Sequence, residues 1–408
     1  MESRRATVRD VRRANRASLL TDLFRGGMQS RQQLAATTAL SQASVSNLIG
    51  EMIEEGLVEE AGLVGSDGGR PRVLLRVRPG FRYVVGADVA ETRVLVELYD
   101  LSMSRLAAAT LEHDDDPAQV AARLLEGLAT VVAEAGVAVK DVLGFGVGVP
   151  GVVEVDDGVV DSQSTGWDAV PLGAMLRAGT EVPVFVENGA KTHGQAEMWF
   201  GAGRGARHAV IIMIGTGVGV AVVMDGRSYR GANSNAGEWG HTTLMYDGEQ
   251  CRCGARGCLE AYIGADRIGA RLAAALGVEH TPELLPETLA RDDLEPAAIE
   301  VFEQTAGYLG AGLADLINLF SPERIAVGGE TGTAFADRFL PEIRRAAARH
   351  ALRRPYASTS IDVCQLGRDA VAMGAATLPI ARLLADGGLP EPPAEPVLSF
   401  APRQRARG

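Results

Sequence analysis

The sequence predicts an α/β protein preceded by a small module of helices and a β-hairpin. Two patterns support this expectation. From about residue 81 onward, short apolar runs typical of buried strands alternate with amphipathic runs of helical period. In the first eighty residues, three helical segments precede two β-like runs. Glycine turns follow several of the expected strands, and the strand ends are where α/β sheets bind ligands.

Composition and charge narrow the class of protein. The chain has 408 residues, of which 46% are hydrophobic and 23% charged, as in a globular protein of two or three domains. No apolar run approaches the ~18–20 residues of a membrane span, and the N-terminus is no secretory signal, so we expect a cytoplasmic protein without membrane insertion. Residues 1–80 contain 12 Arg, no Lys and 9 acidic residues, a net of +3, whereas residues 81–408 carry a net of −15. Two explanations of this charge remain open: a surface that binds a polyanion, or an arginine-rich helix that is exposed to solvent.

The N-terminal module has the element order of a winged helix-turn-helix. Its expected elements are helices at Val11–Phe24, Arg31–Thr37 (after the N-cap Ser30) and about Gln42–Glu55 (after the N-cap Ser41), then β-like runs at Leu57–Leu63 and Val73–Val77. A short helix, a turn and a longer helix allow the third helix to enter a major groove.

The side chains expected to contact DNA lie on the third helix and the hairpin. The outward face of the helix is small and hydrogen-bonding, with Gln42, Ser44, Ser46 and Asn47. Arg70 and Arg72 flank a proline at the hairpin tip, which suits an arginine in a narrow minor groove. The acidic end of the helix (Glu51, Glu54, Glu55) must then point away from phosphate. A helical protein-interaction module with a charged loop is the alternative, but helix order, wing and positive charge together favour double-stranded DNA.

Strands and helices alternate through the rest of the chain. We expect strands at 82–89, 94–98, 142–149, 184–186, 209–214, 220–223 and 324–327, and helices at about 117–135, 296–319 and 369–385. Three of the strands end in glycine turns, at Pro150-Gly151, Gly215–Gly219 and Gly328-Gly329. These turns mark the expected ligand edge of the sheets.

Three of the four cysteines fall within eight residues, and a histidine lies ten positions upstream. The set is His241, Cys251, Cys253 and Cys258. One imidazole and three thiols are the ligands of a closed tetrahedral zinc site, and four protein ligands leave no position for a reacting water. The sequence therefore predicts a structural Zn²⁺ ion. Buried free cysteines beside an unrelated histidine are the alternative.

Residues 81–385, and above all 144–260, resemble the ROK family, named for repressors, open reading frames and kinases. The resemblance rests on Val149-Pro150-Gly151, Glu187-Asn188 and the Gly215–Gly219 loop. Its most specific mark is Gly240-His241 followed, nine residues on, by Cys-x-Cys-Gly-x-x-Gly-Cys-x-Glu. The resemblance implies a two-lobed actin-like (ribonuclease H-like) sugar-kinase fold, with a sugar between the lobes and zinc bracing one wall. The winged helix, including Gly69-Arg70-Pro71, resembles the repressor branch.

These expectations divide the chain into three parts. Residues 1–80 form a DNA-binding domain, and residues 81–385 a sugar-binding domain. Lobe one of the latter covers about 81–188 plus 369–385, and lobe two about 189–368. Residues 386–408, rich in proline and ending in basic residues, are expected to be a disordered tail.

Two working parts of a ROK kinase are missing from this sequence. In the family's kinases, the base is an aspartate directly after the asparagine of the Glu-Asn strand end, and this chain has Gly189 there. The turn that approaches the phosphates corresponds to Asp88–Thr92, in which the glycines are lost and Glu91 stands where phosphates would come. We therefore expect no enzyme activity. A sugar kinase fused to a DNA-binding module is the alternative, and it would need a substitute base near Gly189.

The resemblance places the sugar-holding residues at Asn188, Glu238, His241 and Glu260. Carboxylates and an amide can accept from and donate to adjacent sugar hydroxyls. The alternative is that Glu238 and Glu260 only orient the zinc loop. Lys191 lies close in sequence, which leaves a sugar phosphate open, although a surface lysine is the simpler interpretation.

Together these features predict a sugar-responsive transcriptional regulator of carbohydrate metabolism genes, most often a repressor in this family. A homodimer or tetramer would bind a pseudo-palindromic operator. A sugar or sugar phosphate with higher affinity for one lobe arrangement would change the spacing of the recognition helices. A regulator controlled by a membrane sugar-transport protein is a further alternative that leaves no mark in the sequence.

Overall fold

The computed structural model describes residues 7–66 and 69–389. For residues 64–66 and 69–71 it describes the backbone alone. The chain divides into two compact units. The first comprises Met1–Arg78 and Ala381–Gly408, and the second Pro79–Ile380. Residues 390–408 of the predicted tail lie outside the described residues.

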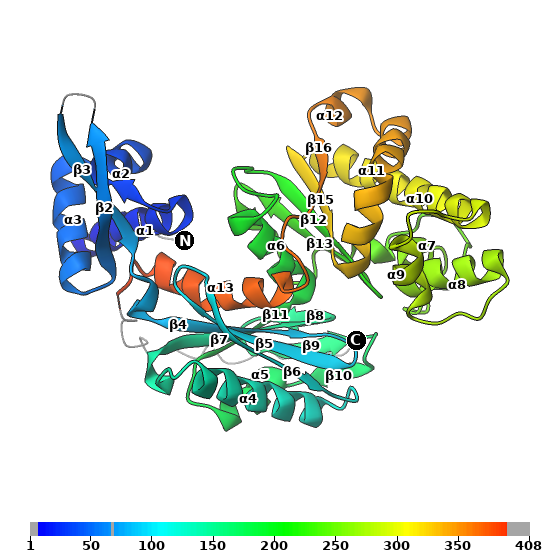
Figure 1. Cartoon of the computed structure of the whole chain (residues 1–408), viewed down its shortest axis with the longest axis horizontal. Helices are drawn as coiled ribbons and strands as arrows, with labels where there is room; N and C mark the ends of the chain where they lie inside the picture. Colours follow the sequence, from blue (N-terminus) through cyan, green and yellow to red (C-terminus); the bar gives the residue numbers. More distant parts are fainter. Residues whose placement is uncertain (1–6, 67–68, 390–408) are drawn as a thin grey trace, which may run out of the picture. The chain divides into compact units, whose positions relative to one another are not determined.

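The first unit contains three helices and a small antiparallel sheet (Figure 1). The helices are α1 (Val8–Gly26), α2 (Arg31–Thr38) and α3 (Gln42–Glu54), and the strands β1 (Gln29–Ser30), β3 (Gly69–Val77) and β2 (Val58–Ser66) pair in that order. The predicted caps are confirmed: the hydroxyls of Ser30 and Ser41 accept the backbone N–H groups at the starts of α2 and α3. Helix α1 begins three residues earlier than expected because Thr7 and Asp10 form a capping box.

The acidic end of α3 faces α1. Arg16 is buried and donates to both carboxylate oxygens of Glu55, at 3.0 and 2.6 Å, while Arg12 pairs with Glu51. The carboxylates of Glu51 and Glu55 are therefore paired with basic residues of the same unit.

The C-terminal end of the described chain also belongs to the first unit. Arg16 Nε donates to the carbonyl oxygen of Gly387 at 2.9 Å, and Arg13 pairs with Asp386. The tail that the sequence analysis expected from residue 386 is therefore folded as far as Leu389, because these polar groups find partners on α1. Charge and proline content alone gave no sign of these contacts.

The second unit contains two five-stranded sheets of the same topology. In the first, β4 (Tyr83–Val89), β5 (Arg93–Asp100) and β6 (Arg105–Glu112) form antiparallel pairs, and β7 (Val142–Val149) and β11 (Val184–Asn188) extend the sheet in parallel beyond β4. In the second, β12 (Ala209–Ile214), β13 (Val218–Met224) and β14 (Arg227–Ser228) repeat the antiparallel part, and β15 (Arg324–Gly328) and β16 (Ser360–Val363) repeat the parallel part. The predicted α/β class is confirmed, and the repeated sheet is what a two-lobed fold requires.

Helices cover both faces of the first sheet (Figure 1). Helices α4 (Pro117–Glu134) and α5 (Leu172–Gly179) share an apolar core with one face. Helix α13 (Ala370–Ala385) packs on the other face, where Gly86 and Gly146 leave room for its backbone: a Cβ on either glycine would lie 1.9 Å from a carbonyl oxygen of α13. Strands β8 (Val152–Glu154), β9 (Val159–Ser162) and β10 (Trp167–Val170) form a small separate sheet.

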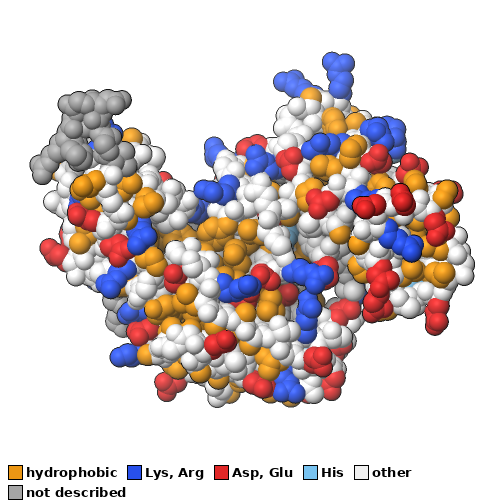
Figure 2. Space-filling view, in the orientation of Figure 1, with side chains coloured by type: hydrophobic (Ala, Val, Ile, Leu, Met, Phe, Trp, Pro, Cys, Tyr) orange, Lys and Arg blue, Asp and Glu red, His pale blue; other side chains and the backbone are white. Residues whose placement is uncertain are grey.

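The second sheet packs against the long helices α10 (Pro296–Phe320) and α11 (Glu330–His350) and against α8 (Ala265–Leu276), around the largest apolar core. Helix α6 (Gly189–Phe200) contacts β12 and β13 and begins directly at the end of β11. The remaining short helices are α7 (Glu260–Ile263), α9 (Leu284–Leu289) and α12 (Arg353–Ala357). Acidic side chains are spread over the second unit in Figure 2, in line with the net negative charge of this part of the chain.

Across the residues with described positions, no helix combines the length and the apolar character needed to cross a membrane.

Candidate metal centre and ligand site

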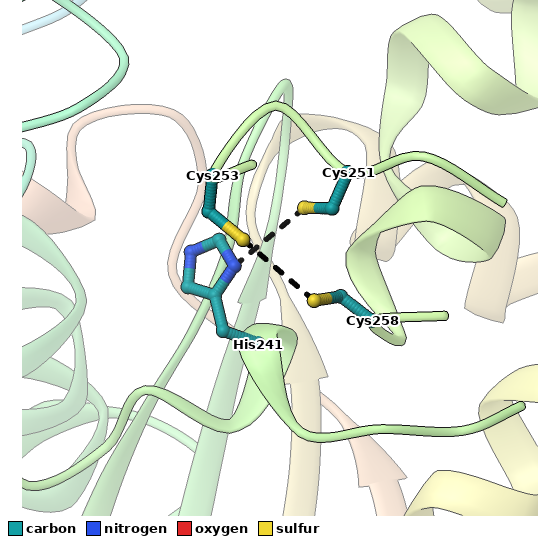
Figure 3. A group of neighbouring side chains, drawn as sticks. All are labelled: His241, Cys251, Cys253 and Cys258. Atoms are coloured by element: carbon teal, nitrogen blue, oxygen red, sulfur yellow. Dashed lines mark hydrogen bonds between the residues drawn. The ribbon is translucent and has the colours of Figure 1, made fainter. Parts of the chain in front are cut away.

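The four predicted metal ligands converge in the structure. His241 ends the 3₁₀ turn η3 (Trp239–His241), and the cysteines follow in the loop that leads into α7. Their ligand atoms all lie within 4.8 Å of one another (Figure 3). The loop can close this tightly because Gly257 has a φ of +79° and passes the carbonyl oxygen of Met245, which a Cβ would meet at 1.7 Å.

The spacing of these atoms fits a tetrahedral zinc ion. Cys251 Sγ lies 3.7 Å from His241 Nδ1, and Cys253 Sγ lies 3.7 Å from Cys258 Sγ. Two sulfurs bonded to one zinc at about 2.3 Å are about 3.8 Å apart. The pKa of Cys258 is raised to about 12, first by burial and then by the neighbouring thiols. A divalent cation would lower this pKa because it stabilises the thiolates. The donor set therefore fits zinc better than four unrelated buried side chains.

Glu260, the first residue of α7, connects the metal loop to the glycine turn before β13. Its side chain is buried, with 5% of the residue exposed. One carboxylate oxygen accepts from Arg252 Nε at 2.9 Å and the other from the backbone N–H of Val218 at 2.9 Å. Both bonds support the interpretation that Glu260 orients the metal loop.

Glu238 has different surroundings. Within the described part of the chain, its carboxylate has no hydrogen-bond or ion-pair partner, and the residue is exposed. Its pKa is raised, first because the surrounding protein displaces water, while His241 and Lys191 lower it and Glu260 raises it further. Glu238 is therefore a free acceptor close to the metal cluster.

The side chain of Asn188 makes two hydrogen bonds, and that of His241 makes one contact. Asn188 caps α6 through Oδ1, which accepts the backbone N–H of Lys191 at 3.1 Å, and its Nδ2 donates to the carbonyl oxygen of Gly151 at 2.6 Å. His241 presents Nδ1 to Cys251, and Figure 3 shows its second ring nitrogen on the far side of the ring. Of the four residues named for the sugar, Asn188, His241 and Glu260 have side-chain contacts within the protein, and only Glu238 has none in the described part of the chain.

The structure corrects the expectation that Lys191 is a surface lysine. The residue is 6% exposed, and its ammonium group donates to the carbonyl oxygen of Ser234. Nearby, Arg230 forms an ion pair with Glu187, whose side chain is 2% exposed. Arg230 was not predicted, because only the fold brings the loop after β14 against the start of α6.

Arg252, between two of the cysteines, was also missed. Besides its bond to Glu260, its Nη1 lies 3.7 Å from Glu91 Oε1. A Cβ on Gly217 would meet Arg252 Nη2 at 2.7 Å. The guanidinium group therefore lies against the glycine turn and pairs with Glu91.

The side chains predicted to contact DNA belong to the first unit. Gln42, Ser46 and Asn47 are exposed on α3, and Arg72 is exposed on β3. Ser44 is half-buried, and its hydroxyl lies 2.9 Å from that of the N-cap Ser41. The side chain of Arg70 lies outside the described residues.

The profile of the ROK family matches residues 84–382, which is more than half of the chain. The chain belongs to the ROK family. Its cluster of one histidine and three cysteines and, apart from Tyr83, its two repeated sheets lie within the matched region.

Relatives of this ROK chain include regulators and a kinase. The xylose repressor of Caldicellulosiruptor bescii is 27% identical over 389 residues, which cover 92% of this chain and 97% of the repressor. The glucokinase of Halalkalibacterium halodurans is 35% identical over 250 residues, which cover 58% of this chain and 75% of the glucokinase. A crystal structure of a ROK family transcriptional regulator, a homolog of the Escherichia coli Mlc protein, matches with a TM-score of 0.77 and 27% identity, covering 93% of this chain and 98% of that one.

Proposed function

We propose that this ROK protein is a sugar-responsive transcriptional repressor of carbohydrate metabolism genes. The observation that carries the proposal is the extent of the similarity. The xylose repressor and the Mlc homolog match nearly the whole chain, including the first unit, whereas the glucokinase matches only 58% of it.

The first unit supports binding to double-stranded DNA as a winged helix-turn-helix. Its helix order and hairpin suit insertion of α3 into a major groove, and the exposed side chains of Gln42, Ser46 and Asn47 can donate to and accept from base edges. Arg72 on the hairpin supplies a positive charge for the backbone or the minor groove. Arg70 completes this set as a proposal from the sequence.

The region around the metal cluster supports sugar binding. Glu238 offers a carboxylate without a protein partner, and the outer edge of His241 and the remaining amide hydrogen of Asn188 can complete a set of hydroxyl contacts. Glu260 belongs to the site through the metal loop that it orients. The Zn²⁺ ion, held by His241, Cys251, Cys253 and Cys258, would fix this wall of the site and supply no reactive position.

Kinase activity has little support in the second unit. Gly189 cannot accept a proton from a sugar hydroxyl. Arg252 covers the glycine turn at Gly217 and pairs with Glu91, so a side chain and its counter-charge stand where ATP phosphates would bind. We therefore propose a regulator without catalysis, acting as a homodimer or tetramer on a pseudo-palindromic operator.

The test is fluorescence anisotropy of the purified chain on DNA from upstream of its own gene and of the neighbouring genes, at fixed salt. Specific binding that one sugar releases would support the proposal and identify the effector. If the chain binds its operator specifically but no sugar alters the affinity, the effector would instead be a transport-protein partner. Absence of specific binding, together with sugar-dependent ATP turnover, would contradict the proposal in favour of a kinase.

A further inference from the structure

Lys191 is unusual for this chain in both its type and its position. The sequence has two lysines, Lys140 and Lys191, and all its other basic residues except histidine are arginines. Lys140 is exposed, whereas Lys191 lies in the first turn of α6 and is 6% exposed. Within the described ranges, the ammonium group donates to the carbonyl oxygen of Ser234 and has no carboxylate within ion-pair distance.

A buried ammonium group with a single neutral partner is unstable. Taking a charge out of water costs free energy unless an opposite charge and hydrogen bonds replace the water. Burial lowers the pKa of Lys191 accordingly. Its place at the start of a helix adds to the cost, because the partial positive charge of the first backbone amides disfavours a cation there.

The nearby carboxylates do not supply the missing partner. Glu187 is paired with Arg230, which places a second cation in the neighbourhood of Lys191. Glu238 is close enough to act on Lys191 through its charge but forms no ion pair with it. The aspartate that a ROK kinase would have at position 189 is absent, although the site has room for a side chain: a Cβ there would lie 3.5 Å from the carbonyl oxygen of Val149.

We propose that the effector carries an anionic group, a phosphate or a carboxylate, and that Lys191 forms an ion pair with it at the start of α6. The proposal deepens the proposed function, on which it rests, by naming the chemical class of the ligand. The first backbone amides of α6 would then favour the bound group, as helix N-termini favour anions. Glu238 remains free to accept from a hydroxyl of the same molecule.

The first test uses inorganic phosphate alone and requires no DNA. Thermal melting is followed for wild type, Lys191→Met and the matched control Lys140→Met while phosphate replaces chloride at constant ionic strength. We expect about 20 mM phosphate to raise the melting temperature of wild type and Lys140→Met by about 2 °C or more, as for a ligand above its Kd, and to leave Lys191→Met unchanged. Without phosphate, Lys191→Met should melt no lower than wild type, because methionine removes a buried charge. Equal phosphate responses of Lys191→Met and wild type would overturn the proposal, as would the absence of any response in wild type.

The second test identifies the source of the anionic group through DNA release. Glucose, glucose 6-phosphate and glucuronate are compared as probes on operator-bound wild type and Lys191→Met. The proposal is supported if glucose 6-phosphate or glucuronate releases the operator from wild type and is at least tenfold less effective on Lys191→Met. Which of the two acts distinguishes a phosphate from a carboxylate. Release by glucose to the same extent in both proteins overturns it. Failure to bind any operator would contradict the proposed function, and the melting comparison would still decide the anion site.

Discussion

Glu238 and Glu260 flank the metal loop, but their carboxylates have different tasks at the scale of single residues. Glu260 is saturated by Arg252 and by the backbone of Val218, so it ties the metal loop to the glycine turn. Glu238 has no partner in the described part of the chain and stays available for a ligand. In the proposed repressor, the His-Cys cluster would position the ligand site through Glu260, and Glu238 would contact the ligand.

Removal of one thiol tests the metal centre. Cys253→Ser should release zinc and lower the melting temperature by several degrees, because the free energy of metal binding is part of the folding free energy. For domains of 150–250 residues, 1 kcal/mol corresponds to about 2–4 °C. Cys364→Ser controls for the loss of a buried thiol, since Cys364 lies with His193 and Glu197 and not with the four predicted ligands. Unchanged zinc content and melting in Cys253→Ser would contradict the structural role.

Asp88, at the end of β4, predicts a pH dependence. Burial raises its pKa to about 7, with Arg93 opposing and Glu97 adding to the shift. In the unfolded chain the carboxyl group titrates near pH 4. The raised pKa therefore contributes stability that is present below pH 4 and is lost as the pH rises through 7. Asp88→Asn stays neutral, so its melting temperature relative to wild type should rise between pH 4 and 8. If the difference in melting temperature between Asp88→Asn and wild type does not vary with pH, the pKa of Asp88 is not raised.

At the scale of elements, the start of α6 determines what the ligand site can do. The helix begins directly at the end of β11, so Asn188 serves as its N-cap, Gly189 as its first residue and Lys191 as the buried cation of its first turn. Where a kinase would present a carboxylate base, this helix presents a backbone and an ammonium group. We propose that this helix end is what separates the repressor from the kinases of the same fold.

Restoring the base alone should not restore catalysis. Gly189→Asp should fold, because the site has room for a Cβ, and should show no sugar-dependent ATP turnover in a coupled assay. Arg252 and Glu91 still occupy the phosphate region in this variant. Turnover well above that of wild type would show that the phosphate region is functional after all.

The hairpin of β2 and β3 predicts a local effect on DNA binding. Arg72→Ala should weaken operator affinity and reduce the slope of log K against log salt by about one, as for the loss of one phosphate contact. Arg123→Ala, an exposed arginine on α4, should leave both quantities unchanged. If Arg72→Ala binds as wild type does at every salt concentration, the hairpin does not contact DNA.

The sequence predicted those parts of the fold and the site that depend on local patterns. Each N-cap, Ser30 or Ser41, lies directly before the helix that it starts, and the four predicted metal ligands lie in one short stretch of the sequence. Spacing and residue type were therefore sufficient to predict both. The burial of Lys191 and the pairing of Arg252 with Glu91 were not predictable in this way, because each depends on chain segments that only the tertiary fold brings together. The folded residues after 385 were missed for the same reason, since their partners are on α1.

At the scale of the whole molecule, one helix belongs to both units. The part of helix α13 that contacts Gly86 and Gly146 packs on the first sheet of the second unit. The boundary with the first unit lies at residue 381, within the same helix. The carbonyl group of Gly387, just beyond the helix, is held by the buried Arg16 of α1. The units are therefore joined at Arg78–Pro79 and again through α13.

The central claim is that ligand binding and operator binding are coupled in one protein. The most direct measurement is the operator Kd with and without the effector, together with the effector Kd with and without operator, at one salt concentration. A repressor released by its ligand requires both Kd values to rise by the same factor, because coupling between two sites is reciprocal. Coupling of 1–3 kcal/mol corresponds to about 5–150-fold. An effector that binds the chain but leaves the operator Kd unchanged would contradict the account.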